Sequence, residues 1–263
     1  MASNDSTSKT LLVAFALCIV CSVVVSTAAV ALKPAQIANM ELDRKRNILA
    51  AAGILEEGRS IDEQFETITT RAVDLRTGRF TDAVDPDSFN QRKAIKDPAL
   101  SDKLDPADDP ARLLRREHYA LVYLVEADDG SVERIILPVR GYGLWGSLYG
   151  FLALEGDGNT VAGLGFYEHK ETPGLGGEVD NPRWKGLWPG KQVYRDGQVE
   201  LTIMKGAVDP SAPDYEFMVD GLSGATLTTR GLDNLVKYWM GPEGFKPFLN
   251  NLQGDRVVLE NRP

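Results

Sequence analysis

The residues best suited to chemistry lie in one stretch, Asp220–Gly231, which reads DGLSGATLTTRG. Its glycines and alanine would let a ligand approach the backbone closely, and its hydroxyls could be esterified or donate hydrogen bonds. An apolar-periodic segment, Gly231–Met240, follows and predicts a helix. Because a helix start offers unpaired N–H groups to an anion, this stretch favours a ligand that carries a phosphate.

A second group of small residues, Gly141–Gly146 (GYGLWG), matches the dinucleotide-binding pattern Gly-x-Gly-x-x-Gly literally. That fold needs a helix after the glycines, whereas Ser147–Leu154 resembles a strand. We therefore expect either a turn forced by packing or a close wall for a flat ligand, which Tyr142 and Trp145 would suit. The segment Gly221–Ala225 approaches the nucleophile-elbow pattern of serine hydrolases, but its last position is alanine, which disfavours that chemistry.

A third dense loop, Glu168–Gly177, reads EHKETPGLGG. Its glycines permit positive φ angles and close approach, while Pro173 stiffens its entry. Taken from the residues alone, it could be a turn between strands or part of a ligand site.

The run Leu11–Leu32 contains no charged residue and is long enough to cross a membrane as a helix. The alternative is a cleavable signal peptide with Ala29–Ala31 at its cleavage site. Either reading tethers the bulk of the chain to a membrane or sends it across one.

Charge and ligand counts exclude several functions. The net charge of −9 argues against a nucleic-acid binder. Cys18 and Cys21, the only cysteines, lie in the apolar run, and two thiols with two histidines predict no metal or cluster site within the chain.

The remaining pattern predicts an α+β chain: one transmembrane helix followed by a mixed, largely antiparallel sheet domain with helices. We expect Pro34 to end the first helix. Two amphipathic helices, or one broken at Gly58, are expected to follow over Ala35–Glu57 and Ile61–Leu75. Strands are expected over Tyr119–Val125, Val132–Val139, Gly146–Leu154 and Val161–Tyr167. The predicted divisions are a tail at 1–10, the membrane span at 11–32, a helical stalk or packing segment at 33–77 and a ligand-binding domain at 78–263.

The stretch around Thr226 resembles the flavinylation motif Asp-x-x-(Ser/Thr)-Gly-Ala-(Thr/Ser) of the covalent FMN-binding family. The loop Glu171–Gly176 (ETPGLG) resembles the second signature of that family, which lies against the flavin ring. The resemblance implies a phosphodiester between FMN and Thr226, with Asp220 and Ser223 read by a flavin transferase. The expected cofactor contacts are Gly141, Leu144, Trp145, Glu171, Thr172, Gly174, Leu175, Gly176, Lys205, Ser223, Gly224, Ala225, Leu227 and Thr228.

Over nearly its whole length the chain is similar to the family of C subunits of Na+-translocating NADH:quinone reductases. The resemblance implies a relay that passes single electrons between an iron–sulfur centre and another flavin on partner subunits, with no catalytic base of its own. The alternatives are the G subunit of the ion-translocating ferredoxin-linked (Rnf) complex and a membrane-anchored assembly module without redox chemistry.

The resemblance also implies a place in the bacterial inner membrane with the large domain in the periplasm. Counting Lys9 against Lys33, Arg44, Lys45 and Arg46 would by itself place that domain in the cytoplasm.

Overall fold

The computed structural model describes residues 6–260, with side chains as far as residue 254. The chain divides into two compact units, 1–44 and 45–263. Helix α1 (Thr7–Ala51) is continuous and includes Pro34, so the expected helix end at Pro34 is wrong. A proline removes one backbone donor from a helix, and here the turns on both sides of it remain helical. Its apolar part is long and hydrophobic enough to cross a membrane, by length and composition.

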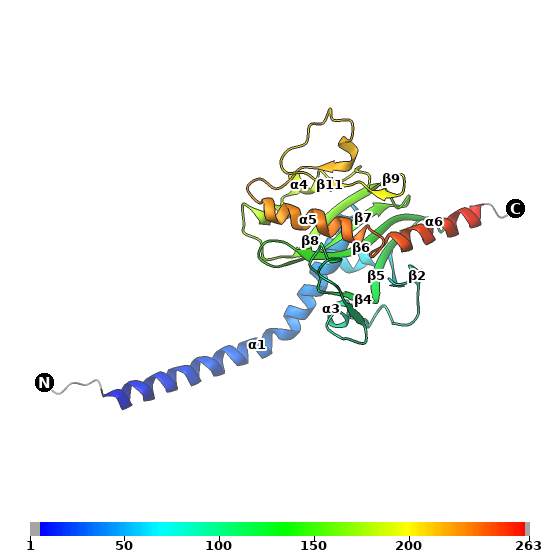
Figure 1. The fold of residues 1–263 in the computed structure, drawn as a ribbon. Helices are drawn as coiled ribbons and strands as arrows, with labels where there is room; N and C mark the ends of the chain where they lie inside the picture. The colour runs from blue at the N-terminus through cyan, green and yellow to red at the C-terminus, as the bar shows by residue number, and fades with distance from the viewer. Residues whose placement is uncertain (1–5, 261–263) are drawn as a thin grey trace. The chain divides into compact units, whose positions relative to one another are not determined.

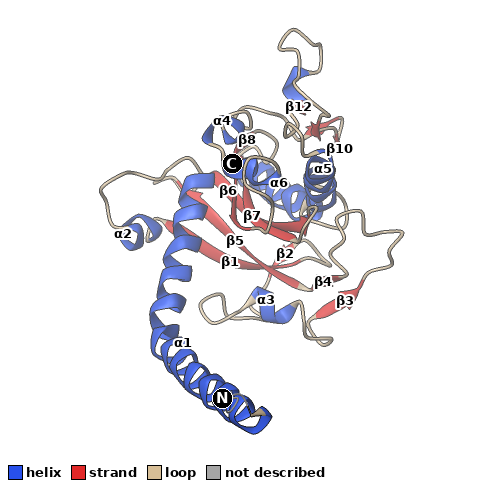
Figure 2. Cartoon of the chain, turned by 90° about the vertical axis from the view of Figure 1, so that its left-hand side faces the viewer, coloured by secondary structure: helices blue, strands red, loops and turns tan. Residues whose placement is uncertain are grey.

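The second unit contains a six-stranded sheet of order β2-β1-β5-β6-β7-β8 in which every neighbouring pair is antiparallel (Figure 2). Its strands are β1 (Ile68–Asp74), β2 (Arg79–Phe80), β5 (Tyr119–Glu126), β6 (Val132–Tyr142), β7 (Ser147–Glu155) and β8 (Val161–Glu168). Three small two-stranded sheets accompany it: β3 (Ser101–Lys103) with β4 (Arg115–Glu117), β9 (Tyr194–Arg195) with β10 (Gln198–Val199), and β11 (Thr202–Ile203) with β12 (Met218–Val219). Only the last of these pairs is parallel, so the predicted α+β class with a largely antiparallel sheet is confirmed.

The helices of this unit after α1 are mostly short. They are α2 (Ile61–Phe65), α3 (Gln91–Ala94), the 3-10 turn η1 (Gly176–Asp180), α4 (Pro182–Lys185), the 3-10 turn η2 (Tyr215–Phe217), α5 (Thr226–Trp239) and α6 (Lys246–Glu260). In Figure 1 the orange helix α5 lies across the strands of the large sheet.

Both faces of the large sheet are buried, because successive residues of its strands point to opposite sides. In β5, Val122 and Leu124 join the core that includes α5, while Leu121 and Tyr123 join a second core with Ile48, at the end of α1. The two cores hold the sheet rigidly between them, which fixes the ends of β6 and β8 where the candidate motifs lie.

Helix α5 approaches the end of β6 closely because Gly231 has no side chain. A Cβ at this position would collide with the Tyr142 carbonyl oxygen and lie 3.1 Å from the Cα of Gly143. The contact is strengthened by the Trp239 indole N–H, which donates to the Arg140 carbonyl oxygen at 2.7 Å. The Arg140 side chain in turn pairs at 2.6 Å with Glu117, a fully buried carboxylate.

The four expected strands are confirmed as β5 to β8, and β7 is the strand expected after Gly141–Gly146. The helix expected over Ile61–Leu75 is wrong for most of its length. Only α2 is helical there, and Ile68–Asp74 is strand β1, paired along its length with β5. The sheet therefore begins within the 33–77 segment expected to be helical. The apolar spacing of this segment suits a helix, but its residues instead form a strand that pairs with β5, far along the chain.

Two helices at the C-terminal end of the unit differ from expectation. Helix α5 starts at Thr226, five residues before the apolar-periodic segment that predicted it. Helix α6 was not expected. Residues 78–110, for which no helix or strand was expected, contain β2, α3 and β3.

Replacing Gly231 by alanine should destabilise the second unit by about 1–3 kcal/mol, because the added methyl overpacks the contact between α5 and β6. Gly254→Ala is the matched control, since Gly254 is also helical and a Cβ there meets nothing within 4 Å. The control should be neutral or stabilising by up to about 1 kcal/mol. Chemical denaturation of both variants measures the difference, and equal effects would contradict the packing account.

Candidate functional site

The N-terminus of α5 is open. Thr226 is its first residue, and the preceding Ala225 offers no side-chain cap. The first helical hydrogen bond runs from the Thr229 N–H to the Ala225 carbonyl oxygen at 2.9 Å. Among the described residues, the N–H groups of residues 226–228 have no acceptor. Three donors and the positive end of the helix dipole are thus available to an anion.

The hydroxyls around this helix start differ in their availability. Those of Ser223 and Thr226 lie on exposed residues. Thr228 is 1 % exposed and donates to a Glu171 carboxylate oxygen at 2.5 Å. Thr229 is buried and accepts from the Leu222 N–H at 3.0 Å. Within the motif, Thr226 is therefore the one threonine with an exposed, unengaged hydroxyl.

Glu171 joins the three stretches singled out in the sequence. Its Oε1 accepts from the N–H groups of Leu144 and Trp145 at 2.9 and 3.0 Å, and its Oε2 accepts from Thr228. The residue is only 5 % exposed. One buried carboxylate thus ties the turn after β6, the loop after β8 and the first turn of α5.

Glycine is required where the chain passes this carboxylate. A Cβ on Gly176 would lie 2.5 Å from Glu171 Oε2 and 2.7 Å from Thr228 Oγ1, and a Cβ on Gly143 would collide with Glu171 Oε1. Real Cβ atoms do not approach that closely, so a larger residue at either position would displace the carboxylate.

Two residues, His169 and Glu168, hold the loop after β8 at its entry. His169 accepts the Glu171 N–H at its Nδ1 (3.2 Å), and its Nε2 lies 2.8 Å from an Asp180 carboxylate oxygen. Glu168 forms a bidentate pair with Arg92 of α3 at 2.7 and 2.9 Å. That hydrogen-bonded arginine holds the pKa of the Glu168 carboxyl below its ordinary value.

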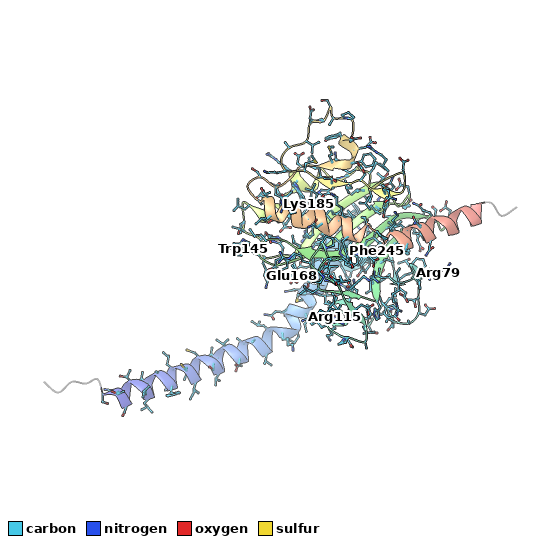
Figure 3. The ribbon with its side chains drawn as sticks, viewed as in Figure 1. Arg79, Arg115, Trp145, Glu168, Lys185 and Phe245 are labelled. Atoms are coloured by element: carbon cyan, nitrogen blue, oxygen red, sulfur yellow. The ribbon has the colours of Figure 1, made fainter. Side chains whose placement is uncertain are left out.

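Exposed apolar side chains concentrate at this site. Six large apolar residues are exposed in the described part of the chain after residue 45, and four of them lie on the three joined stretches. These four are Leu144, Trp145, Leu175 and Leu227, and Trp145 is 63 % exposed. Figure 3 shows Trp145 at the margin of the sheet unit. Such a group beside an open helix N-terminus suits a ligand with an anionic end and a flat apolar end.

The other predicted contacts take several positions. The carbonyl of Thr172 accepts from the N–H groups of Leu175 and Gly177, and Gly174 and Gly224 have φ angles of 76° and 71°. Gly141 is buried, where a Cβ would press on Leu235. Ala225 is the buried N-cap residue of α5.

Asp220 and Lys205 lie outside the cluster formed around Glu171. The Asp220 carboxylate accepts from the Val208 N–H at 2.9 Å, and its carbonyl accepts from the Trp184 indole at 2.8 Å. Lys205 is exposed, and the next residue, Gly206, accepts from the Gly221 N–H. No described hydrogen bond links Lys205 to the start of α5.

The sequence reading missed the contributions of His169, Asp180 and Arg140. The two contacts of His169 are with residues only two and eleven positions away along the chain. A lone histidine before a glycine-rich loop nevertheless gives no signal of its role. The sequence shows that Arg140 precedes Gly141, but it does not show that Glu117 is the buried partner of Arg140.

Comparison with known proteins identifies the family. Residues 143–241 match the FMN-binding domain family. The C subunit of the Na+-translocating NADH-quinone reductase of Pseudomonas aeruginosa is 56 % identical over 258 residues, covering 96 % of this chain and 98 % of that protein. The chain belongs to this family of C subunits.

Other relatives are C subunits as well. The corresponding C subunit of Vibrio alginolyticus is 46 % identical, with 94 % of this chain and 95 % of that protein covered. The crystal structure of Shewanella oneidensis NqrC superposes with a TM-score of 0.76 at 34 % identity, covering 82 % of this chain and 99 % of that one. The fold is also shared with the C subunit from Parabacteroides distasonis, at a TM-score of 0.64.

The ion pair between Glu168 and Arg92 predicts a pH dependence. Because the folded pKa of Glu168 is lowered, its stabilisation is present above the ordinary value of 4.5 and is lost as the pH falls through the lower folded pKa. Both side chains are more than a third exposed, so the contribution should not exceed about 1 kcal/mol. Unfolding free energies of the wild type and Glu168→Gln should differ at pH 7, and the difference should shrink as the pH falls from 4.5 through the lower folded pKa. A difference that stays constant over this range would contradict the assignment.

Proposed function

We propose that the chain carries FMN covalently, as a phosphodiester on Thr226, and serves as an electron-carrying subunit of a Na+-translocating NADH:quinone reductase. The observation that carries the proposal is the position of Thr226, the exposed, unengaged threonine at an uncapped helix N-terminus. The relatives among the C subunits and the FMN-binding domain match support the same reading.

The residues fit the two ends of FMN. A phosphodiester keeps one negative charge, which the free N–H groups of residues 226–228 and the helix dipole would stabilise. Lys205 or Arg230 would add a cation. The exposed group of Leu144, Trp145, Leu175 and Leu227 would cover the flat ring and exclude water from part of it.

FMN supplies the redox chemistry when it is bound, and the chain supplies attachment, orientation and electrostatics. Attachment through the phosphate leaves the ring unmodified, so neighbouring groups would set its electronic properties. The chain would relay single electrons between an iron–sulfur centre and another flavin on partner subunits, without a catalytic base of its own.

Maturation and location complete the proposal. A flavin transferase would recognise the motif through Asp220 and Ser223. It would transfer the FMN phosphoryl group from a flavin dinucleotide to the Thr226 oxygen: the diphosphate bond of the donor breaks, the nucleoside monophosphate leaves and the hydroxyl loses its proton. The apolar part of α1 would anchor the chain in the bacterial inner membrane, with the sheet unit in the periplasm. The hydrogen bond from the Val208 N–H to Asp220 gives this aspartate a role in holding its own loop as well.

The attachment site is tested by co-expressing the chain with a flavin transferase and examining the denatured protein band under ultraviolet light. The wild type should fluoresce, and Thr226→Val should show no fluorescence because it keeps the shape of threonine without the hydroxyl. Thr226→Ser is the matched control and should retain fluorescence. Fluorescence that survives in the valine variant would reject Thr226 as the attachment point.

A further inference from the structure

We infer that Glu171 and Thr228 are positioning residues for the cofactor site: their hydrogen bond holds the first turn of α5 at a fixed distance from the Leu144–Trp145 turn. This inference rests on the proposed attachment at Thr226 and adds to it. It differs from the expectation that both side chains contact the cofactor.

The first argument is that the hydrogen-bonding groups of both side chains are already used. Each oxygen of the Glu171 carboxylate accepts from the protein, Oε1 from two N–H groups and Oε2 from the Thr228 hydroxyl. Thr228 has one hydroxyl proton, and the 2.5 Å hydrogen bond to Glu171 uses it. With 5 % and 1 % exposure, neither side chain presents a surface to a ligand.

The second argument concerns the cost of placing a carboxylate here. Among the described residues, no lysine, arginine or histidine side chain forms an ion pair with Glu171. A buried charge without a cation is stable only where hydrogen bonds replace its lost hydration. The three donors come from two stretches, so Glu171 keeps its place only while both stretches keep theirs. The carboxylate therefore couples the two stretches.

The third argument is what the coupled stretches carry. Thr228 lies two residues after Thr226, within the same helical turn. Leu144 and Trp145, whose N–H groups bind Glu171, are two of the four exposed apolar residues. The coupling thus sets the separation between the site of the phosphate and part of the surface for the ring. The coupling also keeps the Thr228 hydroxyl in a hydrogen bond. Thr226 is then the motif threonine whose hydroxyl is available for attachment.

The experiment compares full-length variants from two sources. Flavin-free chains are purified from cells without a flavin transferase, and flavin-loaded chains are purified from cells that co-express one. Thr228→Val removes the hydroxyl at nearly constant shape, Thr228→Ser retains it, and Glu171→Ala removes the carboxylate. Glu178→Gln is the matched control, a substitution in η1 directly after this loop; Glu178 accepts from the Asn181 side chain and has no described hydrogen bond to the cluster around Glu171. Amide hydrogen exchange of the Leu144–Trp145 turn is measured on the flavin-free chains, and the rate of covalent FMN attachment is measured by intact mass.

We expect exchange at the turn to be at least tenfold faster in Glu171→Ala and several-fold faster in Thr228→Val than in the wild type. Covalent attachment should slow by at least tenfold in both, with far-ultraviolet circular dichroism unchanged. Thr228→Ser and Glu178→Gln should match the wild type in both measurements within about twofold. Recovery by serine separates the hydrogen bond from general packing.

Wild-type exchange and attachment in Thr228→Val would overturn the positioning role, and so would equal losses in Thr228→Val and Thr228→Ser. If Glu171→Ala loses secondary structure, the comparison of Thr228→Val with Thr228→Ser decides whether the hydrogen bond positions the site. If the wild type itself gains no FMN mass, the proposed function fails instead, and hydrogen exchange on the flavin-free chains still tests the coupling.

Discussion

The site depends on one interaction, the set of three hydrogen bonds to the buried carboxylate of Glu171. These bonds connect Glu171 to donors that lie 26 to 57 positions away from it along the chain. Because the carboxylate is shielded from water, each lost donor would leave part of its charge uncompensated. The arrangement also explains why Gly143 and Gly176 have no side chains, since a Cβ at either position would occupy the space of the carboxylate.

The rest of the unit supplies a rigid frame for this interaction. The large sheet is packed on both faces, and α5 lies close against the end of β6 through Gly231. Behind that contact, the Trp239 indole and the buried pair of Arg140 and Glu117 hold the final residues of β6. A frame of this kind lets the candidate site keep an uncapped helix N-terminus and exposed apolar side chains, both of which cost stability.

The sequence predicts the elements whose signals are local. Alternation and short turns were enough for strands β5 to β8, and the clustered small residues and hydroxyls singled out the stretch that forms the start of α5 as the candidate site. It failed at Ile68–Asp74, whose apolar spacing fits a helix but which pairs with β5, far along the chain. The hydrogen bond between Glu171 and Thr228 could not be predicted either, because one sequence does not show which distant polar groups meet. Thr228 was expected to contact the cofactor, and the structure instead pairs its hydroxyl with Glu171.

The central claim is tested most directly by peptide mapping of the chain purified from its native membrane. Trypsin should release Gly206–Arg230, a peptide that contains Ser223 and the three threonines of the motif. The account predicts that this peptide carries one FMN and that fragmentation places it on Thr226. An unmodified peptide, or an FMN on another hydroxyl, would contradict the account.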